Sequence, residues 1–172
     1  MLSKKIEKAL NDQVGNEAEA AFFYLAMASW CEGKSLEGCA AFLYRHFEEE
    51  KDHMLRLIHY INDAGGDAAV PAIKKQTANF SDIKAVFQTV LKHEIAVTTA
   101  INKLVDMCLK ERDYSTHNFL QWYVAEQHEE EKLFRTVLDK IDIIGTDAKG
   151  LYWIDQEVGK LNAALAASEA GA

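Results

Sequence analysis

The sequence predicts an all-α protein: a four-helix bundle with one long crossover and a short fifth helix at the C-terminus. Two observations carry this prediction. The 172 residues contain a single proline, Pro71, and only nine glycines, so few residues interrupt helices. Apolar residues recur at i, i+3 and i+4 over long stretches, which is the spacing of one helix face. The length fits one domain, and we expect residues 1–172 to form it.

Turn residues divide the chain into the expected helices in order. Gly33 ends the first helix, Gly65 the second and Gly145 the fourth, because glycine is the commonest helix terminator. Ser35 is the expected N-cap of the second helix, and Asp147 that of the fifth. The expected helix ranges are 3–32, 36–64, 82–110, 113–144 and 147–166.

The lengths of the connections predict the topology. About three residues join the first helix to the second and the third to the fourth, so each pair is antiparallel. Residues 65–81, which number 17, separate the second helix from the third. Fully extended they reach roughly 56 Å, whereas a helix of this length measures roughly 43 Å. The segment can therefore run the length of the bundle, which makes the second and third helices parallel.

Composition excludes several classes of function. The net charge of −8 argues against binding to the phosphate backbone of a nucleic acid. No apolar run approaches the roughly 18 residues of a membrane span. The first residues lack the apolar stretch of a signal peptide, so a cytoplasmic location is expected. The odd cysteine count, without a CxxC pair, predicts neither disulfides nor a zinc site. The cysteines are Cys31, Cys39 and Cys108.

Each apolar stripe of the four long helices is interrupted near its middle by glutamate. In the first helix Glu17 follows Ile6, Leu10 and Val14 at helical spacing and precedes another apolar run. The second and third helices carry Glu50 and Glu94 in the same way. The expected stripe of the fourth helix is Phe119, Tyr123, Glu126, Glu130, Leu133, Val137 and Ile141.

The four glutamates are expected at one level of the bundle. Residues that face each other in an antiparallel hairpin are equally far from its turn. The midpoint between Glu17 and Glu50 falls at the first turn, beside Gly33, and the midpoint between Glu94 and Glu130 falls in the third connection. In the parallel pair, Glu50 and Glu94 also lie at similar depths. The sequence therefore predicts one layer of carboxylates inside the core.

Buried carboxylates need partners, because burying an unpaired charge is very costly. The stripes offer no lysine or arginine at this level, so bound cations are the simplest partners. His53 follows Glu50 by three residues and shares its helix face. Oxygen donors with one imidazole suit iron or manganese, and carboxylates shared between helices suit two cations. The remaining histidines are expected to be surface or structural residues: His46, His59, His93, His117 and His128.

At these residues the chain resembles the bacterial non-haem ferritins, over nearly its whole length. The segments that carry the resemblance are 16–20 with Tyr24, 47–54, 93–94 and 122–130. The resemblance implies the ferritin-like fold, whose dimetal site combines glutamates with Glu-x-x-His pairs. It also implies a homo-oligomer, a hollow shell of twenty-four subunits with the fifth helix around the four-fold axis.

By the same resemblance the glutamate layer is a ferroxidase centre with two irons. Glu17, Glu50 and His53 would hold the first iron, with Glu50 bridging to the second. Glu94 and Glu130 would hold the second iron. Fe(II) would be oxidised there by O2 or H2O2 and stored inside the shell as a ferric oxide mineral.

The resemblance further implies supporting residues and an absence of haem. Gln127 would hydrogen-bond near the second iron, and Tyr24 would lie beside the centre, either as an electron donor or only as a core aromatic. Bacterioferritins have a histidine where this chain has Glu130 and a haem-ligand methionine where it has Lys51, so no haem is expected. A third, weaker iron position would use Glu49, Glu126, Glu129 and Glu130.

Two other functions stay open at the level of the sequence. One is a dimetal-carboxylate oxidase or peroxidase that keeps its metals and stores nothing. The other is a structural or binding bundle without activity. The fifth helix favours the storage function, because a monomeric oxidase has no need of it.

Overall fold

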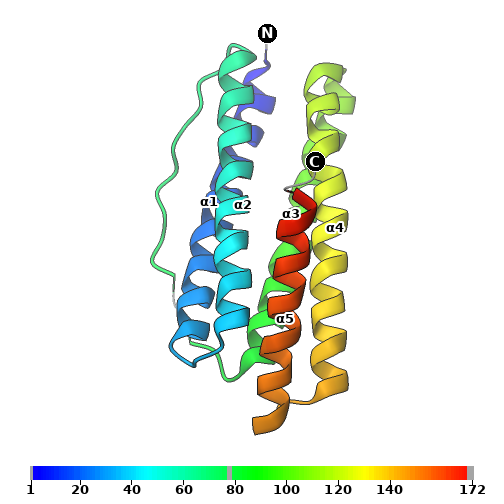
Figure 1. Cartoon of the computed structure of the whole chain (residues 1–172). Coiled ribbons are helices and arrows are strands. Elements are labelled where there is room, and N and C mark those ends of the chain that lie inside the picture. The colour runs from blue at the N-terminus through cyan, green and yellow to red at the C-terminus, as the bar shows by residue number, and fades with distance from the viewer. Residues whose placement is uncertain (1, 77–78, 170–172) are drawn as a thin grey trace.

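The computed structural model describes residues 2–76 and 79–169 and contains, within them, five helices and no strand (Figure 1). The expected all-α class is confirmed. No helix in the described ranges is both long and apolar enough to cross a membrane. The helices are α1 (Lys4–Glu32), α2 (Glu37–Asp63), α3 (Ile83–Glu111), α4 (Tyr114–Ile144) and α5 (Ala148–Glu169).

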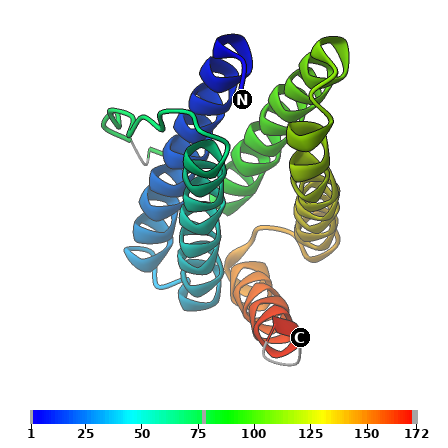
Figure 2. The ribbon, with the colours of Figure 1, turned by 90° about the horizontal axis from the view of Figure 1, so that it is seen from above.

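The four long helices form the bundle, and α5 packs outside it. The pairs α1–α2 and α3–α4 are antiparallel hairpins (Figure 1). The described parts of the segment between α2 and α3 run along the bundle from one end to the other, so α2 and α3 are parallel, as the length of the segment predicted. Seen from above, α5 lies beside the end of α2 and close to α4 (Figure 2), and it packs against both helices.

Local polar side chains begin most of the helices. Ser3, Asp82 and Asp113 accept hydrogen bonds from amides of the first turn, which have no partner inside the helix. Asp147, the expected cap of the fifth helix, accepts from the Gly150 amide at 2.6 Å. The other bonds are Ile6 N to Ser3 Oγ at 3.2 Å, Ala85 N to Asp82 Oδ1 at 2.8 Å and Thr116 N to Asp113 Oδ1 at 3.0 Å.

The expected N-cap of α2 is wrong. Ser35 has φ of 59° and belongs to the turn, while Leu36 occupies the N-cap position without a side-chain hydrogen bond. A distant residue supplies the missing acceptor: Asp155 Oδ1 of α5 accepts from the Cys39 amide at 2.9 Å. Because an acceptor from another helix satisfies this amide, no local cap is needed, and the sequence around Ser35 does not reveal it.

Gly38 allows α5 to approach α2 this closely. A Cβ atom on Gly38 would lie 2.2 Å from the backbone oxygen of Asp155, far inside van der Waals contact. Gly159 faces the same point, where its Cβ would lie 3.4 Å from the Gly38 Cα atom. The joint between α2 and α5 thus depends on two small residues and one buried carboxylate.

The core consists of two apolar clusters with a polar layer between them. Along α1, Val14 belongs to one cluster and Tyr24 to the other. Tyr123 and Phe134 are divided in the same way along α4. All three cysteines are buried and free. Six buried polar residues make up this layer: Glu17, Glu50, His53, Glu94, Gln127 and Glu130. Gln13 and His46 are also buried and lie beside it.

The buried face of α4 differs in part from the expected stripe. Leu120, Gln127 and Phe134 are buried, each seven residues from the next, and they alternate with Tyr123, Glu130 and Val137. Glu126 was expected on this face, yet its side chain is 28% exposed. The buried face of a helix can advance by steps of three or of four residues. The sequence alone did not show which step applies here. The expected residues Phe119, Glu126 and Leu133 are only partly buried.

Candidate metal centre

The polar layer receives side chains from all four long helices. Each of its six members is at most 6% exposed. Their helical spacing continues the apolar stripes on both sides, so the packing that buries the core also turns these groups inward. By helix, the layer comprises Glu17 of α1, Glu50 and His53 of α2, Glu94 of α3, and Gln127 and Glu130 of α4.

Glu17, Glu50 and His53 form one group that could hold a metal ion. Each offers a ligand atom, and these atoms lie within 4.8 Å of one another. His53 Nδ1 is 3.4 Å from Glu50 Oε2. Gln13 Nε2 donates to Glu17 Oε1 at 2.8 Å and so orients that carboxylate. Two of the four helices therefore assemble a three-ligand set.

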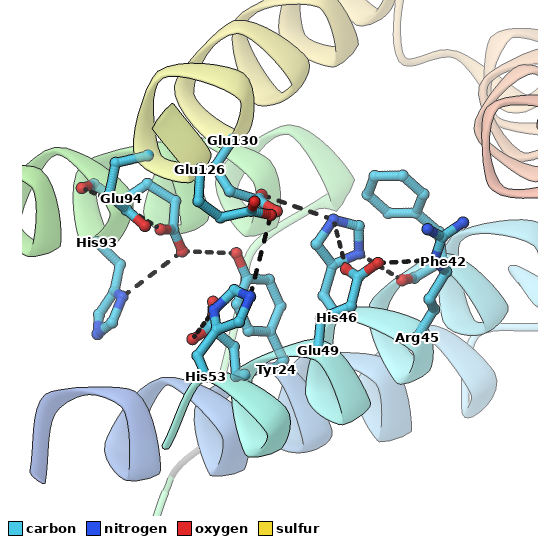
Figure 3. A network of polar contacts seen from close by, with 12 residues as sticks. Tyr24, Phe42, Arg45, His46, Glu49, His53, His93, Glu94, Glu126 and Glu130 are labelled. Atoms are coloured by element: carbon cyan, nitrogen blue, oxygen red, sulfur yellow. Dashed lines mark hydrogen bonds and ion pairs between the residues drawn. The ribbon is translucent and has the colours of Figure 1, made fainter. Parts of the chain in front are cut away.

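Hydrogen bonds from side chains of two other helices, α1 and α4, orient Glu94. The Tyr24 hydroxyl donates to Glu94 Oε1 at 2.6 Å (Figure 3). The Gln127 amide donates to Glu94 Oε2 at 3.1 Å. Tyr24 and Gln127 thus contact this carboxylate and hold it in one orientation.

Glu130 lies beside a residue that sequence reasoning missed. His46, to which no site role was assigned, is 2% exposed, and its Nε2 atom is 3.7 Å from Glu130 Oε2 (Figure 3). The same nitrogen is 3.7 Å from Glu49 Oε2. The three residues form a second group whose ligand atoms lie within 4.8 Å of one another. The sequence held a signal, since His46 precedes Glu49 by three residues on one helix face.

Glu126 and Glu129 lie farther out. Glu126 Oε1 is 3.9 Å from His53 Nε2, and Glu129 is exposed. Both line a pocket of about 720 Å³ between α2, α4 and α5, together with Glu49 and Glu130. A second pocket, of about 380 Å³, reaches His53 and is also lined by Glu49 and Glu126. Glu126 and Glu129 therefore border the openings to the layer, and neither belongs to one of the two three-residue groups.

Burial dominates the electrostatics of the layer. It raises the pKa of Glu17, and the charge on Glu50 raises it further. The pKa of Glu50 is raised by burial and then by the charge on Glu94. Burial, followed by the charges on Glu94 and Glu50, also raises the pKa of Glu130. These carboxyl groups therefore tend to stay protonated unless a bound cation replaces the proton.

Glu94 behaves differently from the other carboxyl groups of the layer. Burial acts to raise its pKa, but the neighbouring His93 ring, the Tyr24 hydroxyl and the Gln127 amide outweigh it and lower the pKa. Glu94 is therefore the group of the layer that carries its negative charge most readily. A cation entering the layer meets one anionic carboxylate that donors already hold in place.

The donor set fits hard divalent cations. Glu50 Oε2, Glu130 Oε2 and His46 Nε2 are buried and have no hydrogen-bond partner among the described residues. Buried polar atoms normally have partners, so these atoms are available as ligands. Carboxylate oxygens with one or two imidazoles are a donor set that suits iron, and this set contains no thiolate.

Comparisons with a protein family and with individual proteins agree with each other. Residues 7–144 match the family Ferritin, described as the ferritin-like domain. The chain is 48% identical over 158 residues to the bacterial non-heme ferritin of Campylobacter jejuni, covering 92% of this chain and 95% of that protein. It is 45% identical to a probable bacterial non-heme ferritin-like protein of Haemophilus influenzae, covering 94% of this chain and 98% of that one.

Solved structures give the same relationship. An open-pore ferritin from the archaeon Archaeoglobus fulgidus superposes with a TM-score of 0.90 at 34% identity, over 92% of this chain and 98% of that one. A ferritin of Chlorobium tepidum superposes with a TM-score of 0.83 at 46% identity, over 92% and 97% of the two chains. The similarity in fold therefore extends over most of the chain.

Proposed function

The chain belongs to the ferritin-like family, and on this premise we propose that it is an iron-storage ferroxidase whose buried glutamate layer oxidises Fe(II). One observation carries the proposal. Four glutamates and His53 meet between two apolar clusters, at most 6% exposed, and no lysine or arginine is among the buried residues described there. Such a layer is stable as an anionic site only with cations in it.

We assign two iron positions in the layer. Glu17, Glu50 and His53 hold the first iron, which their mutual approach within 4.8 Å supports. Glu94 and Glu130 hold the second, and Glu50 bridges the two ions.

The residues perform the oxidation chiefly through charge and position. Anionic oxygen ligands stabilise Fe(III) relative to Fe(II), which favours loss of an electron. Two Fe(II) ions side by side give one electron each to one O2 molecule, which takes up two protons and leaves as H2O2. With H2O2 as the oxidant, the same two electrons and two protons convert it to two water molecules. The pair of ions thus avoids a one-electron step to superoxide.

Supporting residues complete the proposed centre. Tyr24 and Gln127 hold Glu94 through the hydrogen bonds described above. A third, weaker iron position follows from the carboxylates that border the larger pocket, and no haem is expected. The residues of this third position are Glu49, Glu126, Glu129 and Glu130.

Storage requires a shell, and we propose that the chain assembles with itself into one of twenty-four copies. Exposed apolar side chains such as Ile143 and Trp153, 85% and 55% exposed in the single chain, support burial against other copies. The shell would weigh roughly half a megadalton for a chain of 19.3 kDa. A cytoplasmic location is part of the same proposal.

The test of the proposal is aerobic addition of Fe(II) to the assembled protein, with O2 uptake and ferric absorbance recorded together. We expect a fast phase that saturates at the centre, followed by slower growth of a mineral. Glu50→Ala should remove the fast phase, because this carboxylate contributes to both iron positions. An unchanged fast phase in Glu50→Ala would contradict the site, and rapid oxidation without mineral would favour a dimetal oxidase that stores nothing.

A further inference from the structure

A chain of side-chain hydrogen bonds on α1 leads from the polar layer to a less buried residue. Gln13 Nε2 donates to Glu17 Oε1 at 2.8 Å, and Asn16 Nδ2 donates to Gln13 Oε1 at 2.9 Å. Gln13 is 2% exposed, whereas Asn16 is half-buried. Residues three and four positions apart share one face of a helix, so these side chains meet as soon as α1 forms.

Asn16 determines which end of the Gln13 amide faces Glu17. An amide side chain has an oxygen that accepts and a nitrogen that donates. Because the Asn16 nitrogen donates to the Gln13 oxygen, the Gln13 nitrogen is left to face the carboxylate. Reversing the Gln13 amide would place its oxygen 2.8 Å from a carboxylate oxygen and its nitrogen against the Asn16 nitrogen. Both contacts would be repulsive, so the chain of hydrogen bonds has one orientation.

The carboxylates of the layer differ in the hydrogen bonds that they accept. Glu17 accepts from Gln13, and Glu94 accepts from Tyr24. By contrast, Glu50 Oε2 has no hydrogen-bond partner among the described residues. Each of the two proposed iron positions therefore includes one carboxylate that a neighbouring donor holds in place, and at the first position that donor is Gln13.

We propose that Gln13 and Asn16 are positioning residues for the first iron position, and that Asn16 acts through Gln13. This inference rests on the proposed function, which places the first iron at Glu17. A donating amide favours the anionic form of a carboxylate, and the anionic form is the one that binds a cation. The amide also restrains the carboxylate group, so less conformational entropy is lost when an ion binds.

The substitution Asn16→Asp separates this proposal from a simple effect of charge. A negative charge added near a cation site ordinarily raises the affinity for the cation. An aspartate carboxylate, however, can only accept hydrogen bonds, so the Gln13 nitrogen turns towards it and the Gln13 oxygen turns towards Glu17. The Gln13 oxygen then repels the anionic form of Glu17. We therefore expect Asn16→Asp to weaken binding of the first ion, which is the opposite of the simple charge effect.

Anaerobic titration of the assembled, iron-free protein with Co(II), a redox-stable substitute for Fe(II), tests the proposal. Calorimetry gives the affinity, and the visible absorption of Co(II) reports the ligand geometry. Asn16→Asp and Gln13→Leu should each lower the affinity for one ion per chain by about 10–100-fold, the usual effect of losing a residue that orients a metal ligand. The spectrum of that ion should change as well. Wild-type affinity in either variant, or tighter binding in Asn16→Asp, would overturn the proposal.

A double variant tests whether Asn16 acts through Gln13. When Gln13→Leu is already present, Asn16→Asp should not lower the affinity further, because no amide remains to be turned. A second loss of the same size would show that Asn16 acts directly and would overturn the proposal. Asn16→Asp alone changes only a half-buried side chain, so it decides the question if Gln13→Leu does not assemble.

Asn11→Asp is the matched control, because it makes the same chemical change on the same helix. Asn11 bonds to the backbone of the segment after α2, at Asp67 and Ala69, and not to the layer. Its variant should keep the wild-type Co(II) affinity, and a loss equal to that of Asn16→Asp would overturn the proposal. Failure of the proposed function gives a different result: the wild type would oxidise no Fe(II), while Asn16→Asp would still weaken Co(II) binding.

Discussion

At the scale of single residues, the centre is a set of carboxyl groups whose charge the fold opposes. The pKa of Glu50 is raised well above its ordinary value of 4.5, by burial and then by Glu94. A raised carboxyl pKa means that the folded protein retains a proton that the unfolded chain releases. This contribution to stability is complete below pH 4.5 and is lost as the pH rises through the folded-state pKa. Metal binding reverses the trend, since a cation displaces the proton.

We predict that Glu50→Gln stabilises the metal-free protein, increasingly so as the pH rises above 4.5, because glutamine cannot ionise. At about 2–4 °C per kcal/mol for a chain of this size, the Tm of the variant should exceed that of the wild type by roughly 3 °C or more at pH 8. Differential scanning calorimetry of chelator-treated protein from pH 5 to pH 8 measures it. Adding Co(II) should reverse the order, because the wild type gains more from the ion.

The control is Glu19→Gln, an exposed glutamate on α1. Its substitution should change the Tm little, and equally at each pH, because solvent screens the charge. A gap between Glu50→Gln and the wild type that stayed constant from pH 5 to pH 8 would show that Glu50 does not titrate as the buried geometry requires.

At the scale of secondary-structure elements, the joint between α2 and α5 is the feature that local sequence does not reveal. α2 lacks a side-chain cap of its own and takes one from Asp155 of α5. Gly38 and Gly159 let the two backbones approach each other. The start of α2 and the packing of α5 against it therefore stabilise each other. This contact lies about 12 residues before Glu50 in the sequence.

Gly38→Ala should destabilise the protein by about 1–3 kcal/mol, because its Cβ would overlap the backbone oxygen of Asp155 at 2.2 Å. Gly15→Ala is the control within a helix: its Cβ meets only Pro71 Cβ at 4.0 Å. That substitution should stabilise by about 0.5–1 kcal/mol through helix propensity. Urea denaturation compares them, and a loss of stability in both variants would refute the close-contact explanation.

Asp155→Ala should cost about 0.5–2 kcal/mol, the range measured for lost N-caps. Asp155→Asn keeps an oxygen that can accept from the Cys39 amide and should retain most of the stability. Urea denaturation gives the size of the effect, and hydrogen exchange at the first turn of α2 gives its location. Equal losses in both variants would indicate that the charge of Asp155, not its capping bond, stabilises the joint.

At the scale of the whole molecule, the two apolar clusters hold the metal layer between them. Each apolar cluster is buried within its own half of the four-helix bundle, so no further element is needed to form the layer between them. The single chain also leaves apolar side chains exposed near the α4–α5 connection, where Ile143, Ile144 and Trp153 border a pocket of about 320 Å³. Apolar surface of this kind is typical of a contact with another chain.

We predict that Ile143→Lys combined with Trp153→Lys prevents assembly of the shell while the helices stay folded. Lysine in a contact between copies leaves a buried unpaired charge, which costs several kcal/mol per contact. Size-exclusion chromatography should show a shift from roughly half a megadalton to a small species, and circular dichroism should show unchanged helix content. A shell of normal size in the variant would place the contacts between copies elsewhere.

Much of the fold and of the buried glutamate layer was predictable because it depends on local periodicity. Long helices, a crossover that spans the bundle and glutamates at one level all follow from residue spacing and turn position. Spacing could not decide the face of α4 at Glu126 and Gln127, since steps of three and four residues both fit a helix. It also gave His46 no partner, because Glu130 is 84 residues away in the sequence and meets it only in the folded bundle.

The sequence by itself thus determined the all-α class, the topology and the presence of a carboxylate layer, because each depends on the order of residues along one helix or on the length of one connection. Only the tertiary structure decided which ligand atoms lie close enough to share an ion, which donors orient Glu94 and which helix caps α2. Those features arise where side chains from different helices meet, and their geometry depends on how the helices pack, which no single segment encodes.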